Sequence, residues 1–211
     1  MAWQDIERPV VERGVDPAKR EQIIDGARRM FLAQGFDAAS MGSIAREAGV
    51  SKGTLYVYFK SKEELFEAIV EEQCRQQADQ IFNLDSEADL ETELRRVGVE
   101  FARFLCRPDG VSPLRTVIAI ADRMPELGAK FYQSGPATGI ASLKGFFEGK
   151  VAAGILAPND YEVAAAQFID SCLSTTFKPM LFNFAGPPDD TRIIHVVDMA
   201  VRAFLAAYRN R

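Results

Sequence analysis

Residues 40–65 read SMGSIAREAGVSKGTLYVYFKSKEEL, and this stretch decides the fold of the first part of the chain. Ser40 and Ser51 each precede a short run of apolar residues at helical spacing, as N-cap residues do. Gly49 lies between the two runs, where a tight turn favours a residue without a side chain. The pattern predicts two short helices, the second over 52–59, joined as a helix-turn-helix.

Helices are expected on both sides of this motif. Asp16 and Pro17 predict a helix start, because Asp caps well and Pro fits the first turn, and Gly35 predicts its end. Ser61 and Glu64 form a capping-box pattern that opens a long fourth helix. The expected organisation is a flexible arm over 1–15, a helix-turn-helix domain over 16–62 and a larger domain over 63–211.

The rest of the chain also follows helical periodicity, and no segment alternates as a strand does. Gly135-Pro136 is expected to interrupt the helical run, and Pro187-Pro188 precedes the last helix. Helices are expected over 88–106, 112–124, 125–133, 138–153, 158–182 and 191–209. The predicted fold class is therefore all-α, with an N-terminal three-helix head and a larger helical body for ligand binding and dimerisation.

Composition favours a cytoplasmic globular protein. The three cysteines, Cys74, Cys106 and Cys172, are odd in number and form no C-x-x-C pair, which argues against disulfides and zinc. We expect them to be small buried side chains, with redox sensing as the alternative. The N-terminal residues lack the apolar core of a signal peptide, and no run reaches the ~20 apolar residues of a membrane helix. No cofactor or metal is expected.

The charge distribution favours a DNA-binding head. Net charge is −5, yet residues 17–62 carry eight basic and four acidic side chains. The outer side of the helix over 52–59 combines cations, hydroxyls and apolar groups, which suits the acceptors and thymine methyls of the major groove. The alternatives are an incidental charge split and a plain solvated helix face. The residues on this outer side are Lys52, Gly53, Thr54, Tyr56, Val57 and Lys60.

The runs FLAQGFDAASM (31–41) and IAREAGVSKGTLYVYFKSKEEL (44–65) resemble the TetR/AcrR family of transcriptional regulators. The resemblance covers about residues 17–70 and implies double-stranded DNA as a partner. Ser40-Met41 departs from the two threonines of many members, although Ser40 can still cap the helix. By position, the resemblance implies base contacts from Lys52, Gly53, Thr54 and Val57, phosphate contacts from Tyr56, Tyr58 and Lys62, and backbone contacts from Ser40 and Ser43. Tyr58 has an alternative role, in which its ring packs beside Phe59.

The stretch 114–172, with RTVIAIADRMPEL and AAAQF, resembles the AcrR/AefR branch of the family. The last two long helices are apolar almost all round, and such helices must be covered on every side. We therefore expect a homodimer through a four-helix bundle, as the resemblance also implies, with a single large intramolecular core as the alternative. A dimer would read a pseudo-palindromic operator. The predicted interface residues are Ile169, Leu173, Val197, Val201, Phe204 and Leu205.

The resemblance further implies a pocket in the body for a small apolar or amphipathic effector, whose binding releases the DNA. Aromatic and Met side chains form adaptable pockets, although at helical spacing they are also ordinary core residues. Arg115 is a candidate for orienting the effector. The predicted lining residues are Phe101, Phe104, Arg115, Met124, Phe131, Phe147, Phe168 and Phe177.

Other classes of function are less favoured. The chain has one histidine, His195, and lacks a phosphate loop and the hydrolase motifs, so we expect no enzyme. A regulator without an effector and a helical adaptor that binds protein are the remaining alternatives. The basic, hydroxyl-bearing helix over 52–59 argues against the adaptor.

Overall fold

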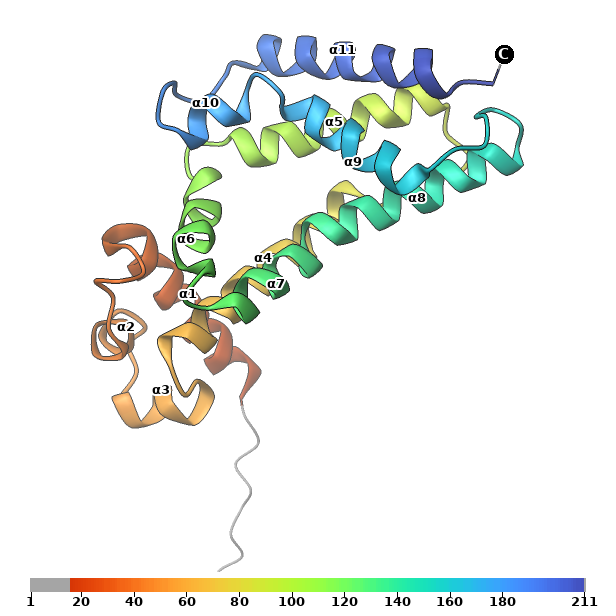
Figure 1. Cartoon of the computed structure of the whole chain (residues 1–211). Helices are drawn as coiled ribbons and strands as arrows, with labels where there is room; N and C mark the ends of the chain where they lie inside the picture. The colour runs from red at the N-terminus through yellow and green to blue at the C-terminus, as the bar shows by residue number, and fades with distance from the viewer. Residues whose placement is uncertain (1–15, 211) are drawn as a thin grey trace, which may run out of the picture. The chain divides into compact units, whose positions relative to one another are not determined.

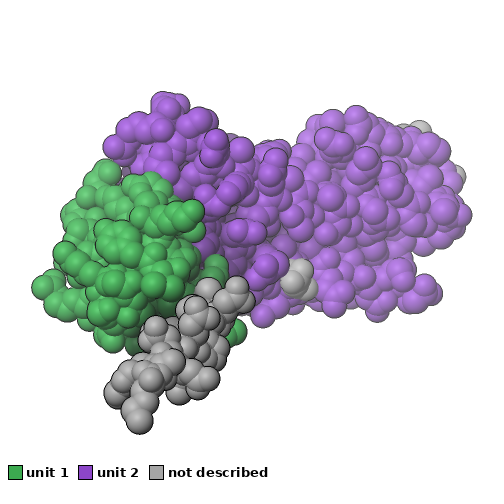
Figure 2. All heavy atoms as spheres, turned by 90° about the horizontal axis from the view of Figure 1, so that it is seen from below, with its two compact units in different colours: residues 1–66 green, residues 67–211 purple. Residues whose placement is uncertain are grey.

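A computed structural model describes residues 16–210, apart from the side chain of Asp79, so the arm expected over 1–15 lies outside the described residues. The described part folds into eleven helices, with one isolated β-bridge between Leu156 and Arg209. The chain divides into two compact units, residues 1–66 and 67–211 (Figure 2). The division falls inside the fourth helix, so that helix contributes to both units.

The first unit contains α1 (Pro17–Gln34), α2 (Met41–Glu47), α3 (Lys52–Tyr58) and the first turn of α4 (Lys62–Ile81) (Figure 1). The caps that the sequence predicts are present. The side chain of Asp16 accepts a hydrogen bond from the backbone N–H of Ala18, and Gly35 ends α1 in the left-handed region, at φ 78°.

A small apolar core holds the first unit together. Ile24, Ile44 and Leu55 are almost completely buried between the helices. Gly26 allows α1 and α2 to cross closely, because a Cβ added there would lie 2.6 Å from the Cβ of Ala48. These contacts fix α3 against α1 and α2 before any partner binds.

The second unit contains the remainder of α4 and seven further helices. Within it, α9 packs on α5, α8 and α11, α5 packs on α11, and α6 packs on α7 (Figure 1). The helices after α4 are α5 (Leu90–Cys106), α6 (Val111–Ala121), α7 (Pro125–Ser134), α8 (Pro136–Ala152), α9 (Tyr161–Leu173), α10 (Phe177–Leu181) and α11 (Asp190–Tyr208).

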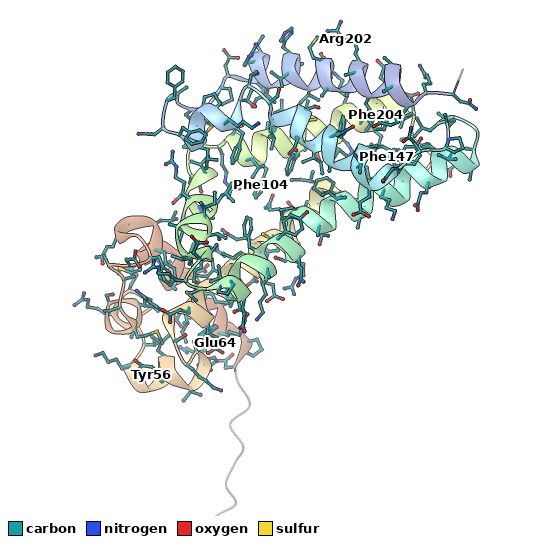
Figure 3. All side chains as sticks on the ribbon, in the orientation of Figure 1. Tyr56, Glu64, Phe104, Phe147, Arg202 and Phe204 are labelled. Atoms are coloured by element: carbon teal, nitrogen blue, oxygen red, sulfur yellow. The ribbon has the colours of Figure 1, made fainter. Side chains whose placement is uncertain are left out.

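An aromatic cluster forms the centre of this unit. The rings of Phe147 and Phe204 lie 4.6 Å apart, centroid to centroid, and Figure 3 shows these two side chains between α8 and α11. Phe168 meets Phe204 edge to face, and Tyr161 packs on Phe147. The aromatic cluster therefore joins α8, α9 and α11.

One predicted helix is two in the structure. The sequence predicts a single helix over 158–182, whereas α9 ends at Leu173 and α10 begins at Phe177. Pro179 explains the break, because a proline ring clashes with the carbonyl four residues earlier, at Thr175, in a continuous helix. The break expected at Gly135-Pro136 is confirmed by the end of α7 at Ser134.

A network of charged groups fixes the connection between α4 and α5. Lys150 is buried, and its ammonium donates to the carbonyls of Ser86 and Ala88 at 2.8 Å each. Glu93 is also buried; it accepts from Arg96 and from the backbone N–H of Asp85. Paired in this way, the buried charges hold an irregular segment against the helices.

The three cysteines are free thiols. Cys106 and Cys172 are buried and Cys74 is half-buried, so the prediction of buried side chains is confirmed for two of them. In the part of the chain that the structure describes, no helix has both the length and the apolar character to cross a membrane.

Candidate nucleic-acid interface

The third helix presents an exposed side on a well-fixed backbone. The Ser51 hydroxyl caps α3 by accepting from the N–H of Thr54 at 3.0 Å, and Leu55 is fully buried beneath the helix. On the outward side, Val57 is 71% exposed and Tyr56 52% exposed. Figure 3 labels the Tyr56 side chain on this helix. An apolar side chain and a phenol left in water on a rigid helix indicate a contact surface.

Lys52 extends this surface towards the second helix. A Cβ added at Gly42 would lie 2.8 Å from Cε and 3.1 Å from Nζ of Lys52, so the lysine stem lies along the first turn of α2. Gly53 is exposed beside it. The ammonium therefore lies close to the start of α2, which makes one continuous face from two helices.

The hydroxyl residues of the interface are partly engaged within the head. Ser40 and Ser43 cap each other: each backbone N–H donates to the other side chain, at 3.0 and 3.1 Å. The Thr54 hydroxyl lies 2.8 Å from that of Ser51. Ser40 and Ser43 lie at the start of α2, and Thr54 is half-buried on α3 with its hydroxyl beside that of Ser51.

Tyr58 joins the helices of the head. Its hydroxyl accepts from the backbone N–H of Asp16 at 3.2 Å, which links the end of α3 to the start of α1. The ring is half-buried, and Phe59 next to it is buried. A tyrosine hydroxyl that accepts one bond can still donate its own hydrogen, so Tyr58 retains a donor for a phosphate oxygen.

Lys62 is hydrogen-bonded within the head in the absence of DNA. Its ammonium donates to three backbone carbonyls, those of Phe36, Asp37 and Ala39, at 2.9, 3.2 and 3.3 Å. A lysine ammonium has three N–H groups, so these carbonyls use its whole donor capacity. The phosphate contact of Lys62 stays a prediction, and to make it the ammonium would exchange one of these carbonyls for a phosphate oxygen.

One cation at the edge of the surface was missed by the sequence-based prediction. The guanidinium of Arg20 lies 5.4 Å from the ring centroid of Phe59, at the end of α3. Its position four residues after the Asp16 cap places it on the first exposed turn of α1, and that spacing was the available signal. Arg20 adds positive charge beside the helix predicted to enter the groove.

The predicted effector-lining residues separate into three groups. Phe147, Phe168 and Phe177 are buried in the core of the second unit, and their role as pocket lining stays a prediction. The guanidinium of Arg115 donates to the carbonyls of Met180 and Leu181, closing the end of α10 instead of facing a pocket. The other predicted residues, Phe101, Phe104, Met124 and Phe131, are half-buried.

Two of the hollows on the second unit lie along α11, and neither of these two is lined by a predicted effector residue. The larger, of about 530 Å³, lies between α5 and α11 and is rimmed by ion-paired arginines such as Arg95 and Arg103. The smaller, of about 290 Å³, lies between α9 and α11. Its lining residues are Ser171, Ser174, Thr175, Arg192, His195, Val196, Met199, Ala200 and Ala203.

The predicted dimer residues are only partly on the surface. Val197, Val201 and Phe204 are at most 4% exposed within the single chain, so they have almost no surface left to bury against a second copy. They pack against α5, α8 and α9, which already cover that side of α11. Figure 3 shows Arg202 on the opposite side of α11 from Phe204. Ile169, Leu173 and Leu205 are half-buried at the edge of the core.

Helices α2 and α3 form a helix-turn-helix, and α3 has an exposed, partly cationic side. This motif, followed in the chain by a larger helical body, defines a DNA-binding regulator of transcription. The comparisons with known proteins agree. Residues 23–69 match the family described as bacterial regulatory proteins, tetR family, and residues 92–210 match the AefR-like transcriptional repressor C-terminal domain. The chain belongs to the TetR family of transcriptional regulators, which are not enzymes.

Individual relatives support the same assignment. The crystal structure of a TetR-family transcriptional regulator from Mesorhizobium loti MAFF303099 is 31% identical, with a TM-score of 0.85 over 91% of this chain and 97% of that one. The flavonoid-responsive regulator FrrA is 33% identical, with a TM-score of 0.76 over 93% of this chain and 100% of that one. The HTH-type transcriptional regulator AcrR of Shigella flexneri is 46% identical over 52 residues, 25% of this chain and 24% of that protein. The alignments to the curated relatives span 24 to 41% of those proteins' lengths.

Proposed function

We propose that this regulator is a repressor that binds a pseudo-palindromic operator as a homodimer and is released by a small apolar or amphipathic effector. The observation that carries the DNA-binding step is the exposed side of α3, where Tyr56 and Val57 lie in water while Leu55 seals the other side. The AefR-like repressor description of residues 92–210 supports repression. The proposed DNA contacts are Ser40, Ser43, Lys52, Gly53, Thr54, Tyr56, Val57, Tyr58 and Lys62.

The proposed dimer uses the outer sides of α9 and α11. Met199 is 50% exposed on α11 and Val163 is 49% exposed on α9, although both are apolar. The hollow between these helices can receive side chains of a second copy, related by a two-fold axis. Two heads held about 34–36 Å apart would read adjacent major grooves on one face of the duplex.

The proposed effector site lies among the half-buried aromatic and Met residues of the second unit. Phe101 and Phe104 stand on α5, Met124 precedes α7 and Phe131 lies on α7. Half-buried residues of this type can repack around a ligand, whereas the fully buried phenylalanines cannot without opening the core. Because the name of FrrA marks it as responsive to flavonoids, flavonoids are the first compounds to test.

A gel-shift titration tests the DNA-binding step. The probe is the duplex upstream of the protein's own gene, and a duplex of scrambled sequence is the control. We expect a complex of two protomers per duplex at low salt, confirmed by sedimentation. If the protein binds neither duplex in dilute salt and without any small molecule, the proposed function is wrong.

A second titration tests release. Flavonoids and long-chain amphiphiles are added to the preformed complex, and the apparent affinity for the upstream duplex is measured. An effector that prefers the DNA-free conformation must weaken binding in proportion to that preference. Unchanged affinity at saturation with every such compound would favour a regulator without an effector.

A further inference from the structure

The two most exposed large apolar side chains of the described residues follow α10 in the chain. Phe182 is 79% exposed and Phe184 is 88% exposed. We call the segment of Phe182, Asn183 and Phe184 the aromatic knuckle. Large apolar side chains that gather in water mark an interaction site more often than scattered ones do. The knuckle therefore needs a partner that covers it.

Hydrogen bonds fix the backbone of the aromatic knuckle. The N–H of Asn183 donates to the carbonyl of Met180 and that of Phe184 to the carbonyl of Pro179, at 2.9 Å each. Asn183 lies in the left-handed region, at φ 56°, which asparagine tolerates better than most residues. The guanidinium of Arg115 also donates to the Met180 carbonyl. A fixed turn presents the two rings, so covering them orders little additional backbone.

The face of α9 and α11 proposed to meet a second copy is short of large apolar side chains. Its hollow is lined mostly by small or polar residues, such as Ser171, Ser174 and Ala203. A standard interface buries about 800 Å² on each partner, and a few large side chains, often aromatic, supply most of its affinity. Two phenylalanines exposed to this extent offer about 300 Å² per copy. The aromatic knuckle would thus supply the anchors that this face lacks.

The knuckle lies at one end of the α9–α11 pair. Helix α10 and the knuckle connect the end of α9 to the start of α11 (Figure 1). At the other end, the rings of Tyr161 and Tyr208 lie 6.0 Å apart, so α9 begins where α11 ends. Val163 lies at that end and is 49% exposed. It stands about two turns before Ser171 of the hollow, and hence on the same face of α9.

A two-fold axis perpendicular to α11 brings these two ends together. Met199 is the middle residue of α11, lines the hollow and is 50% exposed. An axis through this point places the start of one α11 against the end of the other, and every contact then occurs twice. We propose that the aromatic knuckle of each copy packs on the Val163 end of the α9–α11 pair of the second copy. This inference rests on the proposed homodimer and names the side chains that anchor it.

Sedimentation equilibrium over a range of protein concentrations tests the anchor. Both rings are exposed in the single chain, so the double variant Phe182→Ser/Phe184→Ser leaves no cavity in the core. We expect it to raise the dimer dissociation constant at least about a hundredfold, because two aromatic anchors are lost. Phe182→Leu/Phe184→Leu keeps apolar side chains and should retain most of the affinity. Tyr132→Ser is the matched control, since it removes a 56% exposed aromatic side chain on α7, and it should leave the constant unchanged.

The failures of the two proposals are distinguishable in this measurement. A dimeric wild type with an unchanged dissociation constant in Phe182→Ser/Phe184→Ser would overturn the knuckle contact alone, and would leave the rings to a partner other than this chain. A wild type that is monomeric at every concentration would defeat the proposed homodimer and the knuckle contact together.

Disulfide crosslinking tests which ends meet. Phe184→Cys and Val163→Cys proteins that carry tags of different mass are mixed, allowed to exchange subunits and oxidised with copper-phenanthroline. We expect a crosslinked dimer with one copy of each variant. The wild type, whose own cysteines are buried or half-buried, is the control. If Phe184→Cys alone crosslinked as efficiently as the mixture, the two knuckles would meet each other, and the proposed packing would be wrong.

Discussion

Replacing Gly98 by alanine probes the point where three helices of the second unit meet. Gly98 lies in the middle of α5, and an added Cβ would lie 2.7 Å from Cγ1 of Val197 on α11 and 3.0 Å from Sγ of Cys172 on α9. Neither neighbour is the end of a long flexible chain, and both are buried. The helices would therefore have to separate, or Val197 would have to leave its rotamer.

The expected magnitude follows from two opposing effects. Alanine is favoured over glycine inside a helix by about 1 kcal/mol, whereas overpacking a tight core costs about 1–3 kcal/mol. Gly145 provides the matched control, because it lies in α8 with nothing within 4 Å of its added Cβ. Both variants gain the same helix propensity, so the difference between their free energies of unfolding measures the cost of the close contact at Gly98.

Thermal unfolding at one fixed protein concentration measures this difference. For a chain of this size, 1 kcal/mol corresponds to about 2–4 °C in Tm. We expect Gly145→Ala to raise Tm by about 2–4 °C and Gly98→Ala to lower it by a similar amount. If Gly98→Ala raised Tm as much as Gly145→Ala does, the close packing of α5, α9 and α11 would be refuted.

Three further predictions follow from the head, the charge network and the thiols. Lys52→Ala should weaken binding to every duplex and lower the salt slope by about one, and an unchanged slope in salt-dependent anisotropy would contradict its DNA contact. The hydrogen bond from Arg96 lowers the pKa of Glu93 below its ordinary value of 4.5. The ionised Glu93 carboxylate therefore contributes its full stabilisation of the folded state above pH 4.5, and this contribution is lost as the pH falls through the lowered pKa. Tm measured down this pH range should accordingly fall less steeply in Glu93→Gln. Burial raises the pKa of the Cys172 thiol to about 12, so alkylation near pH 8 should modify the half-buried Cys74 first, as mass spectrometry would show; early modification of Cys172 would argue against its burial.

The sequence alone determined the local structure and the kind of protein. Ser40, Ser51 and Gly49 predict the helix-turn-helix because capping and turn formation depend on residues within a few positions of one another. The same short range explains why Tyr56 and Val57 could be assigned to the exposed side of α3. The break after Leu173 was missed although its cause, Pro179, is also local.

Only the tertiary structure decided which apolar faces are inside. Helix α11 has two apolar sides, and by sequence either could face a core: one bears Val197, Val201 and Phe204, the other Met199 and Ala203. The neighbours that bury the first side come from α5, α8 and α9, which are distant in the sequence. The direction of the Lys62 ammonium was likewise settled by carbonyls more than twenty residues earlier in the chain. Burial and hydrogen-bond partners depend on which segments meet in space, and the periodicity of one helix does not contain that information.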